Sequence, residues 1–214
     1  MNRATKANAT AVGVVFGIGG IAHGLGEALQ GNTPTDGLVV NAIAAGSSWT
    51  RWSEGGEPAF TLVPNFLVTG ILATLVGLAV IVWSAGFLHR RRGALVYLLL
   101  FILLFLVGGG IGQVLFFVPA WAVATRIHKP LTWWRRTLPG GLRRGLARLW
   151  PPLPVAASLS ALTALAIVVF GYLPGVADPE RIFATGIALI SAAWVIYLAA
   201  YVAGFAYDVE RAEG

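Results

Sequence analysis

Five long runs without a charged residue constrain this chain more than any other feature of its sequence. The runs cover residues 7–26, 59–88, 93–125, 149–177 and 182–207 and contain 20, 30, 33, 29 and 26 residues. A helix needs about 20 residues to cross a hydrocarbon layer about 30 Å thick. Each run is therefore long enough to cross a membrane once, and the chain is expected to be a polytopic membrane protein.

The composition supports this class of protein and excludes others. Of the 214 residues, 57% are hydrophobic and 11% are charged, whereas soluble domains carry about 25% charged residues. The absence of cysteine excludes a disulfide-stapled secreted scaffold. The high apolar content excludes a disordered chain.

The third run, residues 93–125, is too long for one comfortable crossing and is interrupted by glycine. The segment GGGIGQ occupies residues 108–113, near its middle, and each glycine costs a helix about 1 kcal/mol relative to alanine. A helical hairpin with this segment as its apex is therefore predicted. Two forms stay open: the arms cross as two short spans, or the apex stops inside the membrane as a re-entrant loop.

The basic residues decide between a single crossing and a hairpin. With a hairpin, thirteen of the fifteen Lys and Arg residues lie on the side of the N-terminus, and only Arg51 and Arg181 lie opposite. Basic residues are enriched in cytoplasmic loops. The chain is therefore expected to be an all-α integral membrane protein, a helical bundle of four full transmembrane helices plus the Gly-hinged hairpin, with both termini cytoplasmic.

The whole chain, residues 1–214, is expected to form a single membrane domain. Its spans are expected at residues 11–29, 60–84, 94–107, 112–125, 153–173 and 183–206. Residues 30–58 form the outer loop, in which residues 38–45 are expected to lie along the interface as a short helix. Glu57 is interpreted as an acid at the positive end of the helix dipole of the second span.

The first span resembles a signal peptide in outline, because a basic start precedes an apolar stretch. Six glycines between residues 13 and 26 dilute that stretch, and no clear cleavage site precedes Asn32. We expect the span to be retained. The expected location is the plasma (inner) membrane of a prokaryote, with several spans.

Glycines recur on one face of the first span, at positions spaced by four, three and four residues. They are Gly13, Gly17, Gly20 and Gly24. Such a smooth strip lets another helix approach closely. A helix-packing seam is the simpler interpretation, and a homodimer or a second membrane subunit packed on the strip is the alternative.

His23 and Glu27 lie four residues apart on the same side of this span, and Glu27 directly follows its uncharged run. An acid at membrane depth costs about 3 kcal/mol on insertion scales and usually faces the bundle interior. The pair can relay a proton. A metal site is disfavoured because further strong ligands are missing. The simpler alternative is that Glu27 reaches headgroup water and His23 bonds a backbone carbonyl.

Asn65, beside Pro64, and Gln113, at the hairpin apex, are expected at the same depth as Glu27. Three spans that bring polar groups to one level can surround an outward-facing polar cavity. His23, Glu27, Asn65 and Gln113 are therefore the candidate substrate- or proton-binding residues. The alternative is that the three residues lie at helix ends for unrelated reasons and form no common cavity.

The inner loop, residues 126–150, combines tryptophans, arginines and a leucine stripe at helical spacing. Basic amphipathic segments of this kind lie in the headgroup plane and prefer anionic lipids. The expected headgroup contacts are Trp133, Trp134, Arg135, Arg136, Arg143, Arg144 and Arg148. Nucleic acid is a poor alternative, because the membrane topology already accounts for these arginines.

No motif of a known enzyme class stands in the sequence: a P-loop, a Rossmann fingerprint and HExxH are all missing. No catalytic residue, metal or cofactor is assigned. The leading hypothesis is a small transporter, permeation protein or membrane-complex subunit with a polar site near the outer half of the bundle. One alternative is a membrane-embedded enzyme acting on lipid or isoprenoid head groups with His23 and Glu27 as acid and base. Another is a purely structural membrane partner.

Overall fold

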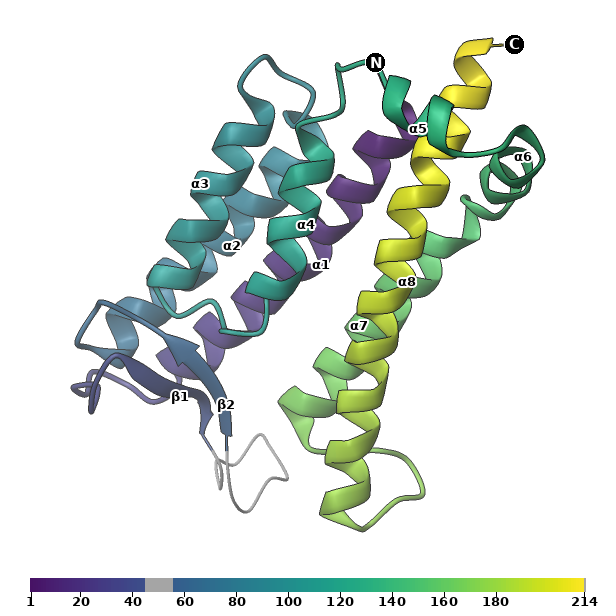
Figure 1. The fold of residues 1–214 in the computed structure, drawn as a ribbon. Helices are drawn as coiled ribbons and strands as arrows, with labels where there is room; N and C mark the ends of the chain where they lie inside the picture. The colour runs from purple at the N-terminus through teal and green to yellow at the C-terminus, as the bar shows by residue number, and fades with distance from the viewer. Residues whose placement is uncertain (45–55, 214) are drawn as a thin grey trace.

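The fold is a mainly helical bundle with one small sheet at its end (Figure 1). The computed structural model describes residues 1–44 and 56–213. The helices are α1 (Arg3–Ala28), α2 (Phe66–Gly86), α3 (Gly93–Leu106), α4 (Val114–Ala124), α5 (Thr132–Thr137), α6 (Gly140–Leu149), α7 (Pro152–Phe170) and α8 (Pro179–Glu213). The strands β1 (Val39–Ala44) and β2 (Gly56–Phe60) pair in antiparallel orientation.

Four of the described helices, α1, α2, α7 and α8, are long and apolar enough to cross a membrane. The helices α3 and α4 are also apolar but have only 14 and 11 residues. This agrees with the four long helices and the short helical pair predicted from the sequence. The side of the membrane on which each end lies stays a prediction.

The outer segment differs from its prediction. Residues 38–45 were expected to form an interfacial helix, but Val39–Ala44 is a strand paired with β2. The β-branched Val39, Val40 and Ile43 fit a pleated strand better than a helix, and the edge of β2 supplies the hydrogen-bond partner. The bundle is thus not purely α-helical.

Glu57 also lies in this sheet and not at the start of a span. The helix α2 begins at Phe66, with Asn65 as its N-cap: the Asn65 side chain accepts a hydrogen bond from the Val68 N–H at 3.1 Å. Glu57 is part of β2 and pairs with Ile43. Its interpretation as a helix-start acid was wrong, because strand pairing across the loop outweighed the local helix signal.

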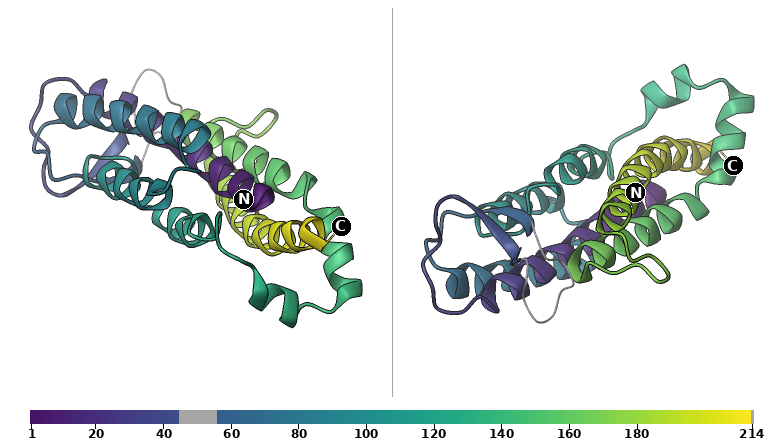
Figure 2. Two further views of the ribbon diagram at one scale, coloured as in Figure 1. Left: turned by 90° about the horizontal axis from the view of Figure 1, so that it is seen from above. Right: turned by 90° about the horizontal axis from the view of Figure 1, so that it is seen from below.

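The helix α1 lies at the centre of the bundle. It packs along α2 on one side and contacts α4, α7 and α8 on the others (Figure 2). The helices α7 and α8 form an antiparallel pair, joined by a turn that starts at Gly171 in the left-handed conformation. Aromatic side chains from α3, α4 and α8, including Tyr97, Phe101, Phe117 and Tyr197, fill the core.

The glycine strip of α1 is occupied inside the chain. A Cβ added to Gly24 would lie 2.6 Å from the Gly70 carbonyl oxygen, and one added to Gly17 would lie 2.9 Å from that of Gly77. Gly13 faces the Ser84 side chain of α2 and the Tyr97 ring of α3, and Gly20 faces the Leu104 side chain of α3. Gly17 and Gly24 let α1 and α2 pack backbone to backbone, so this face of α1 is not free for a dimer contact.

The hairpin apex between α3 and α4 is supported by β2. The Gly108 N–H donates to the Phe60 carbonyl at 3.0 Å, and the Leu62 N–H donates to the Leu106 carbonyl at 2.9 Å. The Thr69 hydroxyl donates to the Val107 carbonyl at 2.8 Å. The apex therefore lies beside the first turn of α2. Of the two arms, α3 packs on α2, and α4 packs on α1 and α3.

The two ends of the hairpin and both chain termini meet at the opposite end of the bundle (Figure 1). His128 donates from its ring to the His89 carbonyl at 2.7 Å. The Asp208 carboxylate of α8 accepts hydrogen bonds from the Ala4 and Thr5 N–H groups at 3.0 and 2.8 Å. An acid at a helix N-terminus satisfies free donors and favours the dipole, which fixes the start of α1 against the end of α8.

Candidate functional site

A cleft of about 540 Å³ separates α1, α4 and the hairpin apex from α7 and α8. Small residues on facing helices leave this space open, among them Gly19 on α1, Ala161 and Ala164 on α7, and Gly186 on α8. The volume lies within the roughly 300–1,000 Å³ of small-molecule sites. The walls are mostly aliphatic and aromatic, so most of the cleft suits an apolar ligand.

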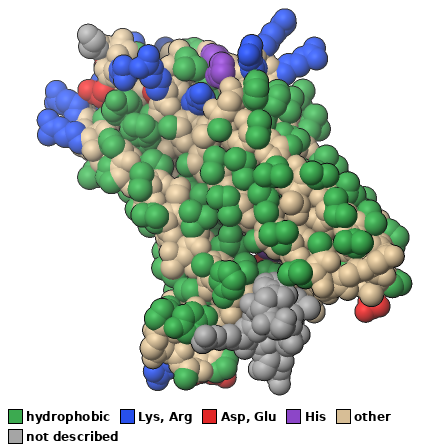
Figure 3. Space-filling view, turned by 180° about the vertical axis from the view of Figure 1, so that it is seen from behind, with side chains coloured by type: hydrophobic (Ala, Val, Ile, Leu, Met, Phe, Trp, Pro, Cys, Tyr) green, Lys and Arg blue, Asp and Glu red, His purple; other side chains and the backbone are tan. Residues whose placement is uncertain are grey.

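The open side of the cleft is also apolar. Leu115, Phe183, Ile187 and Val195 line it and are exposed to the surroundings of the protein. The Trp194 indole N–H of α8 donates to the Leu115 carbonyl of α4 at 3.2 Å, which joins the two walls at one point. Much of the lateral surface of the bundle is apolar, and charged side chains gather at its ends (Figure 3). In a bilayer, such an opening faces acyl chains.

One part of the cleft wall is polar. His23 and Gln113 line it and are 6% and 4% exposed. Within the described part of the chain, the His23 Nε2 atom and both amide atoms of Gln113 lack a hydrogen-bond partner. The third member is Glu57, whose Oε1 atom lies 3.8 Å from His23 Nε2. We call these three residues the polar end of the cleft.

The hydrogen bonds of His23 define which ring nitrogen is available. Its Nδ1 atom lies 2.9 Å from the Gly19 carbonyl oxygen. A carbonyl only accepts, so Nδ1 carries the proton. In the neutral ring, Nε2 is then an acceptor at the cleft. Gly110, at φ +95°, lies so close that a Cβ there would be 2.7 Å from this nitrogen.

Glu57 is the charged member of the polar end. Burial raises the pKa of this carboxyl above its ordinary value, and the neighbouring His23 partly opposes that shift in pKa. The sequence analysis placed no site residue here. The contact with His23 joins residues 34 positions apart and depends on the β1–β2 pairing, so no local pattern signals it.

Glu27 lies outside the lining of the cleft. Its side chain is fully buried, and neither carboxylate oxygen has a hydrogen-bond partner among residues 1–44 and 56–213. The backbone of Gly108 packs directly on the carboxylate, and Thr69 lies beside it. The simpler alternative of the sequence analysis, that Glu27 reaches headgroup water, does not hold in this fold, because the hairpin apex covers the carboxylate.

Asn65 is also outside the cleft lining. Besides capping α2, it donates from its side-chain amide to Asn32 Oδ1 at 2.8 Å. Of the four polar residues singled out in the sequence, the structure thus brings His23 and Gln113 into one cleft and places Glu27 and Asn65 elsewhere. Among residues 1–44 and 56–213, no three His, Cys, Asp or Glu side chains are grouped as metal ligands.

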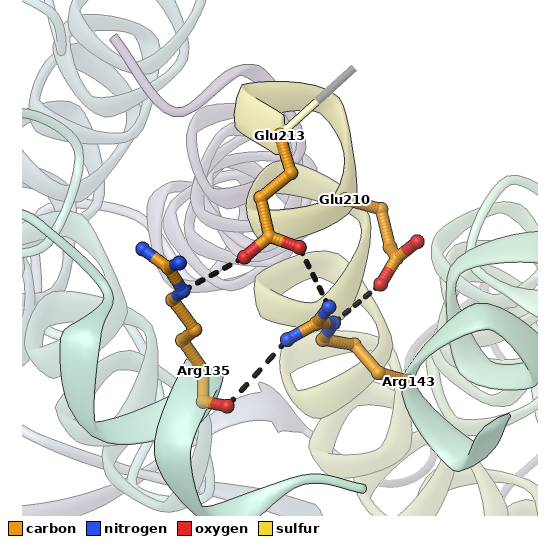
Figure 4. Close-up of polar contacts among 4 residues, drawn as sticks. All are labelled: Arg135, Arg143, Glu210 and Glu213. Atoms are coloured by element: carbon orange, nitrogen blue, oxygen red, sulfur yellow. Dashed lines mark hydrogen bonds and ion pairs between the residues drawn. The ribbon is translucent and has the colours of Figure 1, made fainter. Parts of the chain in front are cut away.

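The basic segment 126–150 is partly engaged within the chain (Figure 4). Arg143 pairs with Glu210 and, at 2.6 Å, with Glu213, and Arg135 Nε lies 2.8 Å from Glu213. The Trp134 ring stacks on Phe205. The exposed members of the predicted headgroup set are Trp133, Arg135, Arg136, Arg144 and Arg148.

Both acids of this network lie beyond residue 206, where the last span was expected to end. The helix α8 continues to Glu213. The charged end of α8 is therefore an anchor for α5 and α6, which the sequence pattern did not indicate.

Comparison of the chain with protein-family models, with curated proteins and with solved structures gives no match. The chemistry of the cleft therefore has to be inferred from its own side chains.

Proposed function

We propose that this protein is a small multi-pass membrane transporter that takes a lipid-like amphiphile from the bilayer into the cleft. The observation that carries the proposal is the polar end of an otherwise apolar cleft, where His23 Nε2 and the Gln113 amide are buried without a hydrogen-bond partner among the described residues. The expected setting is the plasma membrane of a prokaryote, with anionic lipid around the basic end.

The energetics favour a ligand with two distinct parts. Leaving a buried polar group without a partner costs about 1–3 kcal/mol, and a polar head that bonds His23 Nε2 and the Gln113 amide offsets this cost. The apolar part of the same ligand lies against α4, α7 and α8. Moving an acyl chain from the bilayer into the cleft gains little free energy from the hydrophobic effect, because the bilayer is already apolar. The polar contacts therefore decide which molecule stays bound.

The position of the polar end suits transport. It combines the glycine-broken apex of a helical hairpin with side chains from α1 and β2. Transport folds often build their sites from such discontinuous helices, because broken backbone next to a cavity can rearrange. Movement of α7 and α8 against α1 and α4 would open and close the cleft.

The test is transfer of a labelled amphiphile between leaflets of vesicles that contain the purified protein. Ile187→Trp adds bulk to the cleft wall and is expected to reduce bound amphiphile and transfer about tenfold or more, roughly 1.4 kcal/mol. Leu75→Trp is the matched control, because Leu75 is exposed on α2 and does not line the cleft. Equal transfer by both variants and by the parent protein would refute the proposal.

A second candidate, an enzyme acting on lipid or isoprenoid head groups, has one observation in its favour. His23 Nε2 and Glu57 Oε1 lie 3.8 Å apart at the end of a cleft with an apolar opening. This is a possible acid–base pair, with Glu57 in the place that the sequence analysis gave to Glu27. Recovery of a chemically altered amphiphile, lost in His23→Gln while binding persists, would favour this candidate over transport.

A further inference from the structure

We infer that the amphiphile bound in the cleft has a hydrogen-bond-donating head, a hydroxyl or an ammonium group, and that phosphate and carboxylate heads are rejected. This inference rests on the proposed function and adds to it the class of substrate. It follows from the donors, acceptors and charges at the polar end.

The polar end offers more acceptors than donors. In the neutral ring of His23, Nε2 accepts, because Nδ1–H is bonded to the Gly19 carbonyl. Gln113 adds one acceptor oxygen and one donor NH₂ group, and both are unpartnered. The Glu57 carboxylate adds two acceptor oxygens. A head with O–H or N–H groups can therefore bond all three side chains.

An anionic head finds few partners in the same place. Phosphate and carboxylate oxygens accept hydrogen bonds. Among the described side chains that line the cleft, the Gln113 NH₂ group is the main donor at the polar end, and Ser191, farther along on α8, can donate or accept. Lys and Arg are missing from the described residues that line the cleft. An anion would also lie near the Glu57 carboxylate, and like charges repel.

The shape of the polar end favours a compact head. The apex presents Gly109, Gly110 and Gly112 to the cleft, so backbone and not side chains forms this part of the wall. Gly110 packs against the His23 ring, and Gln113 follows Gly112 in the same wall. A small hydroxyl or ammonium head fits this description better than a large polar head with several charges.

Binding of three probes with the same oleyl chain tests the inference: monooleoylglycerol, oleylamine and oleate. The protein is held in nanodiscs at mildly alkaline pH, and displacement of a fluorescent amphiphile is measured. Monooleoylglycerol, oleylamine or both are expected to bind about tenfold or more tightly than oleate. Oleate binding as tight as that of the other two overturns the inference.

Two variants separate the hydroxyl from the ammonium source. If the natural head is an ammonium group, Glu57→Gln reduces oleylamine binding and leaves monooleoylglycerol binding nearly unchanged. If the head is a hydroxyl group, monooleoylglycerol binds more tightly than oleylamine in the parent protein, and Gln113→Leu reduces its affinity. Both patterns support a donor head and identify its kind.

A charge reversal provides the sharpest check. Glu57→Lys places a cation beside the acceptors, so oleate is expected to bind this variant about tenfold more tightly than the parent, while oleylamine binding falls. Unchanged probe preferences in Glu57→Lys overturn the role of Glu57. If none of the three probes binds the parent protein and Ile187→Trp changes nothing, the proposed function itself fails. Binding led by oleate refutes only the substrate class.

Discussion

At the scale of single residues, the hairpin apex packs tightly on Glu27. Gly108 has φ +100°, and a Cβ added there would overlap the Glu27 carboxylate. Gly108→Ala is therefore expected to destabilise the protein by about 1–3 kcal/mol, through the left-handed backbone and the overlap together. Thermal unfolding in detergent, followed by circular dichroism, measures this loss.

Gly112→Ala is the matched control for that substitution. Gly112 belongs to the same apex, but its φ is not positive and nothing lies within 4 Å of an added Cβ. It is expected to change the stability by less than about 0.5 kcal/mol. Combining Gly108→Ala with Glu27→Ala removes the overlapping carboxylate and should restore part of the loss. Equal stability of the two alanine variants would contradict this account of the apex.

The pKa of Glu57 leads to a pH prediction for the polar end. Burial raises the pKa of this carboxyl, so Glu57 takes up a proton at a higher pH than an exposed glutamate. Only the charged form attracts an ammonium head. Oleylamine affinity should be full above the raised pKa and should fall as the pH drops through it. Displacement titrations over a pH series measure the effect.

The stability of the ligand-free protein should depend on pH in the opposite direction to the oleylamine affinity. A carboxyl whose pKa is higher in the folded than in the unfolded chain favours folding most at low pH, below the unfolded pKa. This contribution is lost as the pH rises through the folded pKa. Glu57→Gln should flatten both profiles, because glutamine does not take up a proton in this range. An unchanged profile in Glu57→Gln would contradict the prediction.

The residues of the candidate site were predictable only where the signal was local. His23 and Gln113 stand out in the sequence because each is a polar side chain inside an apolar run or at a glycine break. Their common cleft depends on α7 and α8, which no spacing in the sequence connects to them. Glu57 was missed because its contact with His23 depends on a strand pairing over a loop.

At the scale of elements, the packing of α1 on α2 depends on glycines that face each other. Gly24→Leu places a branched side chain against the Gly70 backbone and Thr74. Overpacking of this kind usually costs about 1–3 kcal/mol, and a lower unfolding temperature in detergent is the expected result. Gly19→Leu on the same helix is the control, since nothing lies within 4 Å of its added Cβ. A control as unstable as Gly24→Leu would mean that leucine at any α1 glycine is harmful.

The long elements were predictable because hydropathy and length determine them. Four apolar helices and a short helical pair follow from the uncharged runs alone. The end of α8 was not predictable in this way. In the sequence, the acids after residue 206 indicate the end of a span. In the structure, α8 continues past them, because Asp208 accepts hydrogen bonds from the start of α1 and Glu213 pairs with Arg143. Contacts between distant parts of the chain outweigh the local pattern there, as they do in β1.

At the scale of the whole molecule, the structure places the loop after α2 and the loop after α4 at one end. His128 bonds the His89 carbonyl, and Asn2 bonds the Arg126 and Lys129 carbonyls at 2.7 and 2.9 Å. The space-filling view shows basic side chains gathered at this end (Figure 3). By the positive-inside rule, this end is expected to face the cytoplasm.

Cysteine labelling tests this orientation directly, because the natural chain contains no cysteine. Single variants Arg91→Cys and Trp133→Cys lie at the basic end, and Ala177→Cys lies in the turn between α7 and α8. In intact cells, a membrane-impermeant maleimide is expected to label only Ala177→Cys, and all three after the cells are opened. Labelling of Arg91→Cys or Trp133→Cys in intact cells would place the basic end outside. The helices α7 and α8 form one wall of the cleft and extend to the end of the bundle that holds β2. The same labelling result would therefore also reverse the side of the membrane, and thus the leaflet, from which the amphiphile reaches the polar end.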